Sequence, residues 1–447
     1  MSHTSKLHQL LIPITLLICM VNAEMEMDDT EEFTRPNITN AGSKTFHWLM
    51  TLLLLLIVPS LATVLTFAEK LHTSVFLQLV SLGYAALEAL FLRFPDGDGV
   101  ENRTSRGTAW FLLFLNGATV FVGSLNSGTN WFLKNKNGGE VHWIANLGER
   151  SIRIIHRTLS VLLTLTGWIK TCLAPVAMFG FCREIHTGQC IAHGIMGTAF
   201  IGYGLFYALI LVLPYFRETR HKNSQDFYDS LVMTVWGIVN TFTEHRWGRE
   251  GWGHGDYQHT AMGIIWWSGG LLGLYLGRGG RRTWIPSLLL IYTGWAMSEH
   301  NQHLAISTKV HYMFGLSLML GGFIRILEIT FLLNDERSIP GKIMSFQYLP
   351  SFCLIESGVM FMAANEEQLR LVLRLEADHS SYIMVVTSAA FLIYLWFLLL
   401  LELYQTLTAS YKIDLTRYAS VSGTDREQQQ NDDLASFELD DLEEDRR

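Results

Sequence analysis

The chain has 447 residues, of which 49% are hydrophobic and 17% are charged. This composition excludes an ordinary soluble domain and predicts an all-α, polytopic membrane protein whose first partner is the lipid bilayer. The formal net charge of −8 is not the basic balance that a nucleic-acid partner requires, and no such partner is predicted.

The N-terminus has the features of a secretory signal. Lys6 precedes an apolar stretch from Leu10 to Val21, and Val21-Asn22-Ala23 provides a cleavage site of small residues. Residues 1–23 are therefore predicted to be a signal peptide. The alternative is a first transmembrane helix that is left uncleaved. The acidic segment 24–46 then lies in the lumen or outside the cell.

Eleven apolar windows follow the signal, each about as long as a membrane-spanning helix requires. They fall near residues 48–67, 72–94, 108–126, 154–178, 191–214, 229–243, 258–277, 284–298, 309–333, 346–363 and 380–403. The predicted fold is a membrane helical bundle of about eleven transmembrane helices in two halves, residues 47–215 and 228–404.

Glycosylation motifs and basic loops agree on the direction of these helices. Asn37 and Asn102 begin N-glycosylation motifs, and both fall on the outer side. Cys182 and Cys190 share an outer loop and are predicted to form a disulfide, because that compartment oxidises thiols. The opposite loops carry the basic excess that is typical of the cytosolic side, at Lys134, Lys136, Arg150, Arg153, Arg217, Arg220, Lys222, Arg278, Arg281 and Arg282.

The C-terminal tail, residues 405–447, is rich in Asp and Glu. Such a run is solvated, so the tail is predicted to be disordered and cytosolic. Together with the signal, it predicts a multi-pass protein of a secretory-pathway membrane: endoplasmic reticulum, vacuole or plasma membrane.

Four histidines stand near the ends of predicted spanning helices in the N-terminal half. His47 and His193 begin their helices on the outer side, and His72 and His156 begin theirs on the cytosolic side. Two neutral imidazoles from facing helices are an axial ligand set for a low-spin haem b, so each face has one candidate pair. The alternative is that they are helix-end residues bonded to water or backbone.

The segments around these histidines resemble the transmembrane core of the cytochrome b-561 and DOMON-reductase group. The resemblance rests on His47-Trp48-Leu49-Met50 with Val58-Pro59, Leu71-His72 with Gln78 and Gly83-Tyr84, His156-Arg157-Thr158-Leu159 with Leu165, and His193-Gly194-Ile195-Met196-Gly197. It implies two b-type haems and transmembrane electron transfer. One departure is an additional helix, Trp110 to Asn126, between the second and third histidine helices. It reverses the direction of the later two helices, so the histidines on the same face of the membrane are His47 with His193 and His72 with His156.

The C-terminal half contains an internal repeat. Thr243-Glu244-His245 recurs as Ser298-Glu299-His300, and the helix after each begins with a histidine and a glycine one turn on; a weaker third copy has Glu356-Ser357 before His379. Imidazoles and carboxylates converging on the outer side are a ligand set for a transition metal. The alternative is a hydrogen-bond network that locks the hairpins. The candidate metal ligands are Glu244, His245, His259, Glu299, His300, His303 and His311.

Helix order, signal, Glu-His repeat and acidic tail together resemble the fungal YTP-type integral membrane proteins, a likeness that implies an architecture and no established activity. Three functions remain open. The first is a haem-dependent oxidoreductase that carries electrons across the membrane from a small reductant or a redox partner protein to ferric or cupric ion. The second is a transporter of metal ions or protons through the C-terminal Glu/His cluster, and the third is a structural or sorting protein without a cofactor.

Overall fold

The computed structural model describes residues 41–93, 103–135, 142–182, 187–218, 222–243, 251–299, 302, 304–334 and 343–409. Within these ranges every regular element is a helix, which confirms the all-α membrane bundle. Each of the eleven predicted windows coincides with a helix. Seven helices of the described ranges are long and apolar enough to span a bilayer: Gly42–Phe67, Leu71–Phe91, Arg103–Gly128, Arg150–Phe179, Thr187–Val212, Ala305–Leu332 and His379–Ala409. The number of about eleven spans therefore stays a prediction.

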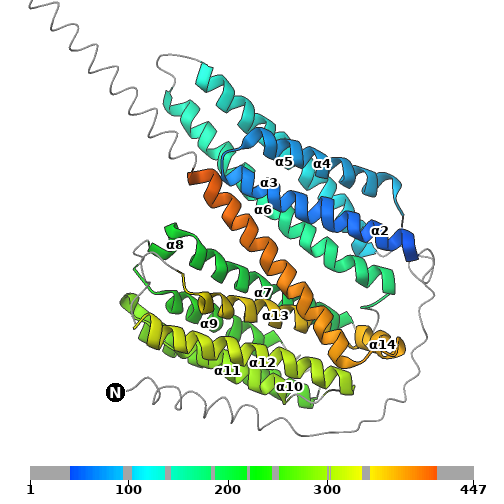
Figure 1. Cartoon of the computed structure of the whole chain (residues 1–447), viewed down its shortest axis with the longest axis vertical. Helices are drawn as coiled ribbons and strands as arrows, with labels where there is room; N and C mark the ends of the chain where they lie inside the picture. The colour runs from blue at the N-terminus through cyan, green and yellow to red at the C-terminus, as the bar shows by residue number, and fades with distance from the viewer. Residues whose placement is uncertain are drawn as a thin grey trace, which may run out of the picture.

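The first helices form a bundle of their own, drawn in blue and cyan in Figure 1. Its core includes Leu55, Tyr84, Leu112 and Leu163, all buried. The elements are α2 (Ala41–Thr51), the π-helix η1 (Leu52–Ile57), α3 (Val58–Phe67), α4 (Leu71–Phe91), α5 (Arg103–Asn135) and α6 (His142–Phe179). Because α2, η1 and α3 are continuous, they make one long helix that packs on α4 and α6.

The π-helix has a local cause in the sequence. Pro59 lacks an N–H and cannot donate to the carbonyl of Leu55, one turn earlier. The Val58 N–H instead bonds to the Leu53 carbonyl, which gives the wider turn. The Leu55 carbonyl then faces Gly167 of α6, where a Cβ would lie only 1.8 Å away from the oxygen. Glycine at 167 therefore lets α6 pack directly on the bulge.

The remaining helices form a second unit, in green and yellow in Figure 1. They are α7 (Thr187–Val212), α8 (Pro214–Glu218), α9 (Gln225–Thr243), α10 (His254–Gly277), η3 (Arg278–Gly280), α11 (Ile285–Ser298), α12 (Ala305–Leu327), η4 (Glu328–Leu332), η5 (Ser345–Tyr348), α13 (Leu349–Ala363) and α14 (Glu366–Arg374). The extensive helix contacts are α9 with α10, α11 with α12, and α7 with α13. The second unit therefore consists of three helix pairs.

The three pairs repeat one sequence pattern. One helix of each pair carries a serine and then a glycine: Ser230 and Gly237, Ser287 and Gly294, Ser351 and Gly358. The other helix carries a histidine and two glycines at a constant spacing: His259, Gly263 and Gly270; His311, Gly315 and Gly322; His193, Gly197 and Gly204. The third glycine pair is formed by α13 with α7. Helix α13 also packs on the helix that begins at His379, where Phe352 stacks on Phe391. Helix α7, placed in the first half by the sequence, thus packs in the second unit.

Glycine allows the paired backbones to touch. A Cβ on Gly358 would lie 2.5 Å from the carbonyl oxygen of Gly197, and a Cβ on Gly197 would lie 2.6 Å from that of Gly358. The equivalent glycines meet in the same way in the other two pairs, at Gly237 with Gly263 and Gly294 with Gly315. Small residues are the usual means of close helix packing in a membrane, where burial of apolar surface drives little association.

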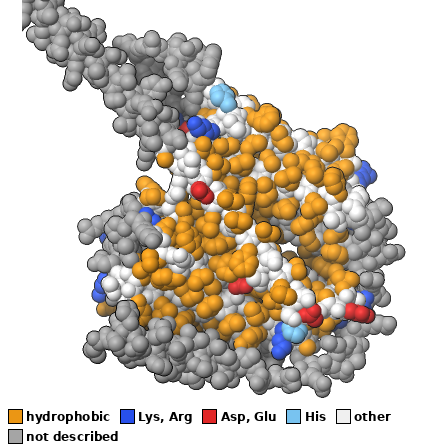
Figure 2. All heavy atoms as spheres, in the orientation of Figure 1, with side chains coloured by type: hydrophobic (Ala, Val, Ile, Leu, Met, Phe, Trp, Pro, Cys, Tyr) orange, Lys and Arg blue, Asp and Glu red, His pale blue; other side chains and the backbone are white. Residues whose placement is uncertain are grey.

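The C-terminal helix, His379–Ala409, runs between the two units and is the orange helix of Figure 1. Its Trp396 indole donates to Ser60 Oγ of α3 at 3.0 Å, and its Gln405 amide donates to the Val212 carbonyl of α7 at 2.8 Å. Hydrophobic side chains cover most of the face drawn in Figure 2, as expected for contact with lipid.

We expect Gly197→Val to destabilise the protein by about 1–3 kcal/mol, because the added side chain overpacks the α7–α13 contact. The melting temperature of the detergent-purified protein measures the effect. Gly202→Val is the matched control, since Gly202 lies on the same helix with nothing within 4 Å of its Cβ position. Equal melting temperatures for the two variants would show that the close contact is not required.

Candidate functional site

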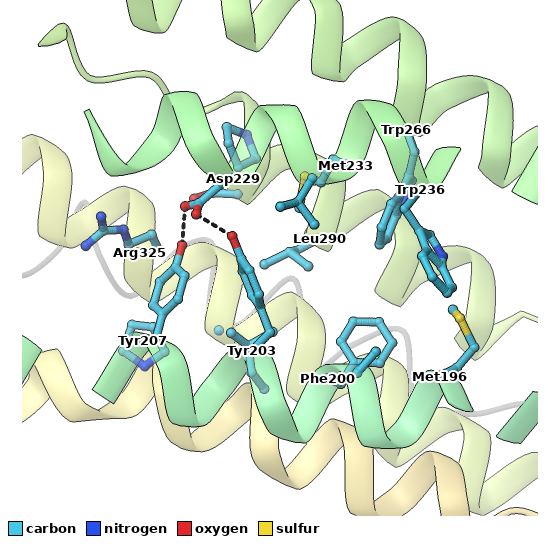
Figure 3. A pocket seen from close by; sticks show the side chains of 17 residues that line it. Met196, Phe200, Tyr203, Tyr207, Asp229, Met233, Trp236, Trp266, Leu290 and Arg325 are labelled. Atoms are coloured by element: carbon cyan, nitrogen blue, oxygen red, sulfur yellow. Dashed lines mark hydrogen bonds between the residues drawn. The ribbon is translucent and has the colours of Figure 1, made fainter. Parts of the chain in front are cut away.

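A cavity of about 120 Å³ lies at the centre of the second unit, between its three helix pairs (Figure 3). All six paired helices contribute to its wall, which is mostly apolar and aromatic. The lining residues include Met196, Phe200, Tyr203 and Tyr207 of α7, Asp229, Val232, Met233 and Trp236 of α9, Trp266 of α10, Pro286 and Leu290 of α11, Arg325 of α12, and Pro350 and Leu354 of α13. Such a pocket with a few convergent polar groups is the usual form of a small-molecule site.

Equivalent positions of the three pairs surround this cavity. Met233, Leu290 and Leu354 occupy the same place relative to the repeated serine and glycine, and all three line the wall. The position before the serine also faces the cavity in each pair, and there the side chains differ: Pro286, Pro350 and Asp229. The cavity therefore lies where the repeats meet, and the carboxylate of Asp229 is a departure from the repeat.

Asp229 is held by two tyrosines across the cavity. Tyr203 donates its hydroxyl to Oδ1 and Tyr207 donates to Oδ2, each at 2.5 Å, as the dashed lines of Figure 3 show. Only 4% of the Asp229 surface is exposed. These bonds connect α7 with α9, so the carboxylate bridges the α7–α13 pair and the α9–α10 pair.

A cluster of charged side chains lies next to Asp229, and its guanidinium groups and carboxylates bond to one another. Arg325 donates to Glu328 Oε2 at 2.6 Å and to Asp226 Oδ1 at 3.3 Å. Arg282 also donates to Asp226, at 3.3 Å to either oxygen. Both guanidinium groups are thus bonded to Asp226, and Arg325 is also bonded to Glu328, whereas Asp229 is bonded to neutral hydroxyls.

The N-terminal bundle contains a separate buried ion pair. Lys170 Nζ lies 2.8 Å from Glu88 Oε1 and donates to the Ser105 carbonyl at 2.8 Å. His47 joins this group: its Nε2 lies 3.4 Å from Glu88 Oε1 and its Nδ1 lies 2.8 Å from the Tyr84 hydroxyl. Both ring nitrogens of His47 therefore face side-chain partners, and neither is directed at His193.

His72 and His156 lie at the other end of the bundle, both against α5. His72 Nδ1 is 3.0 Å from Ser127 Oγ. His156 is fully buried, with Nε2 at 3.1 Å from Gln78 Oε1 and Nδ1 at 3.4 Å from the Asn126 amide nitrogen. The Cβ position of Gly123 lies 2.7 Å from His156 Nε2. Axial ligation of a haem by His156 does not fit this arrangement, because both nitrogens are engaged and α5 occupies the adjacent space.

His193 lies beside His311, a residue that the sequence assigns to a different cluster. Their ring centroids are 5.8 Å apart, and the Phe361 ring lies 4.5 Å from His193. His311 Nδ1 also bonds the Ser307 carbonyl at 2.9 Å. The predicted haem ligand of α7 and the predicted metal ligand of α12 thus form one buried aromatic cluster, and the repeat explains why: both begin equivalent helices.

The predicted metal cluster falls largely outside the described residues. Glu244, His245, His300 and His303 lie there, while Glu299 is exposed and His259 is half-buried. Among the residues that the structure describes, no three His, Cys, Asp or Glu side chains come together as metal ligands. The metal site therefore stays a prediction.

Of the remaining predicted features, the cysteine pair lies within the described residues and the others lie wholly or largely outside them. Cys182 and Cys190 form a disulfide, and Glu367 of α14 accepts from the Cys182 N–H at 2.5 Å. Asn37, Asn102, the signal at 1–23, the segment 24–40 and the tail from residue 410 lie outside the described residues.

Asp226, Asp229, Arg325 and Glu328 were missed by the sequence analysis, which followed histidines. A signal for them existed: each is an ionisable residue in or beside an apolar window, and such residues in membrane segments are costly by default. Their proximity, however, depends on helices that are far apart in the chain.

The fold and the cavity define a class, that of polytopic α-helical membrane proteins with an internal pocket between repeated helix pairs. The family described as "Protein YTP1-like, C-terminal" matches residues 166–405, a range that contains all three pairs and the C-terminal helix. The chain belongs to this YTP1 family of integral membrane proteins.

Relatives in two yeasts support the assignment. "Protein YTP1" of Saccharomyces cerevisiae is 55% identical over 96% of this chain and 94% of its own length. An uncharacterised membrane protein of Schizosaccharomyces pombe is 26% identical over 48% of this chain and 51% of its own. A second uncharacterised membrane protein of Saccharomyces cerevisiae is 27% identical over 33% of this chain and 27% of its own. No solved structure matches the chain.

We expect Lys170→Met to destabilise the protein strongly, by about 3–5 kcal/mol, because it leaves the Glu88 carboxylate buried without its cation. The double variant Glu88→Gln/Lys170→Met removes both charges and should regain most of the loss in melting temperature. Lys309→Met, at an exposed lysine, serves as the control. A double variant no more stable than Lys170→Met would contradict the importance of the ion pair.

Proposed function

We propose that this membrane protein is a carrier that binds a small solute in the central cavity, with Asp229 as the ionisable group of the site. The observation that carries the proposal is the position of Asp229: a buried carboxylate at the wall of a cavity, bonded only to tyrosine hydroxyls in the contacts described above. Ionisable residues in membrane segments commonly mark solute or proton pathways.

The departure of Asp229 from the repeat supports a role in function over one in packing. The equivalent positions hold Pro286 and Pro350, so the helix pairs assemble without a carboxylate there. Asp226, one turn earlier on α9, shows what a structural acid looks like in this protein, since it is bonded to two guanidinium groups. Asp229 has no guanidinium partner in these contacts and is bonded to two tyrosine hydroxyls.

The arrangement of the repeats also supports a carrier. The three helix pairs run in the same direction, and parallel repeats of this kind surround the solute site in several transporter folds. Helices α11 and α13 have 14 and 15 residues, fewer than the roughly 20 that span a bilayer, and each begins with a proline that lines the cavity.

The orientation of the carrier is part of the proposal. The positive-inside bias assigns the end of the cavity that holds Asp226, Arg282 and Arg325 to the cytosol, together with the C-terminus. The secretory-pathway membrane and the glycosylated outer face follow from the same sequence features.

Reconstitution into vesicles that contain a pH-sensitive dye tests the carrier. We expect one of three membrane-impermeant solutes (tetramethylammonium, erythritol or methanesulfonate) to accelerate the decay of an imposed pH gradient, because transport of the solute is coupled to protonation of Asp229. Asp229→Asn should abolish the acceleration while it preserves hydrogen bonding to a tyrosine. Asp378→Asn, at an exposed aspartate, is the control. Equal decay with wild type and Asp229→Asn for all three solutes would contradict the proposal.

Electron transfer through two b-type haems is the competing proposal, with His47, His72, His156 and His193 as ligands and a small reductant or redox protein as partner. Both His72 and His156 contact residues of α5, which supports their pairing, but the hydrogen bonds of His156 oppose ligation. The absorption spectrum of the purified protein, oxidised and then reduced with dithionite, decides between them. The carrier proposal predicts no haem band, whereas a sharp reduced α-band that is lost in His156→Ala would favour electron transfer.

A further inference from the structure

We propose that the solute of the central cavity is a small organic monocation, such as a short quaternary or tertiary ammonium ion. This inference rests on the proposed carrier function and specifies the chemical class of its solute. It follows from the charges around Asp229, the aromatic wall of the cavity and the volume of the cavity.

In the contacts described above, Asp229 is bonded to tyrosine hydroxyls and to no cation. Of the neighbouring guanidinium groups, Arg282 is bonded to Asp226, and Arg325 is bonded to Asp226 and Glu328. A buried carboxylate without a counter-charge is costly, so the site takes up either a proton or a cation at Asp229.

The wall of the cavity suits an organic cation better than a bare metal ion. Phe200, Tyr203, Trp236 and Trp266 contribute aromatic rings, with Met196 and Met233 between them (Figure 3). Aromatic faces attract ammonium groups through their quadrupole, and such rings around a cation are the usual recognition site for alkylated ammonium ions. A metal ion would require several oxygen or nitrogen ligands, which this apolar wall does not provide.

The dimensions of the cavity limit the solute to a few heavy atoms. A dry apolar cavity of about 150 Å³ accommodates benzene, so about 120 Å³ is suited to a cation of similar or smaller size. Val232 of α9 lines the cavity and is 49% exposed, so the cavity wall reaches the molecular surface at this residue. Helix α9 is also the helix that the two tyrosine bonds connect with α7.

Cation and proton compete for the same carboxylate. The titratable groups that face Asp229 are Tyr203 and Tyr207 from α7, Asp226 from α9 and Arg325 from α12. Helices α10, α11 and α13 contribute only uncharged residues to the described wall, such as Trp266, Leu290 and Leu354. Protonation of Asp229 removes its negative charge, so affinity for the cation falls as the pH falls. Binding of a cation to the protonated site displaces the proton of Asp229, which would couple the solute to proton movement.

Binding to the full-length, detergent-purified protein tests the solute class separately from transport. We use three probes of similar size and different charge: tetramethylammonium, tert-butanol and pivalate. In isothermal titration we expect tetramethylammonium to bind at least tenfold more tightly than the other two, with lower affinity at acidic pH. Asp229→Asn should weaken its binding at least tenfold, Asp229→Glu should restore most of it, and Asp378→Asn should leave it unchanged.

A second variant keeps the test valid if Asp229→Asn does not fold. Trp236→Leu preserves the apolar wall but removes one aromatic face, and it should weaken tetramethylammonium binding severalfold without affecting tert-butanol. Equal binding of the three probes, or unchanged affinity in the Asp229 and Trp236 variants, would overturn the proposal.

The vesicle experiment distinguishes this failure from failure of the carrier function. Tetramethylammonium that binds through Asp229 but does not accelerate proton flux supports the solute class and contradicts transport. Flux that is driven by erythritol or methanesulfonate, with no binding of tetramethylammonium, supports transport and overturns the monocation.

Discussion

The structure depends on close contact between glycine-bearing helices. Within a bilayer the lipid tails are as apolar as the side chains, so helices gain little from burial and associate through packing. The contacts of Gly197 with Gly358, Gly237 with Gly263, and Gly294 with Gly315 bring three helix pairs to the same short separation. Because the pairs are alike, equivalent residues on their inner faces meet around one centre, and the cavity lies there.

Several buried charges of the described residues form ion pairs. Lys170 and Glu88 in the first bundle, and Arg325 with Glu328 and Asp226 in the second unit, are ion pairs in which the desolvation of each charge is offset by its partner. Asp229 has only hydroxyl partners in these contacts, and the equivalent positions of the other two pairs hold prolines. Binding of a cation or a proton is most favourable at a buried carboxylate that has no cationic partner.

Histidine placement was a partial guide to the architecture. The spacing of His259 with Gly263 and His311 with Gly315 identified two repeats correctly, and His193 with Gly197 belongs to the same pattern. The third pair was predicted from Glu356 and His379, whereas α13 pairs with α7. The chain order conceals this pairing, because α7 precedes the other two pairs in the sequence and α13 follows them. The predicted site consequently followed the histidines, which here pack against serine, glutamine and aromatic side chains.

The sequence by itself determined the membrane class, the position of the apolar helices, the cysteine pair and two of the three repeats, since all of these depend on local hydrophobicity and spacing. Only the tertiary structure decided which helices pair, that His193 lies beside His311, and that Asp229 meets Tyr203 and Tyr207. The physical reason is that apolar windows are nearly interchangeable in lipid. Their partners are selected by the positions of a few glycines on each helical face, and that geometry appears only when the faces are brought together.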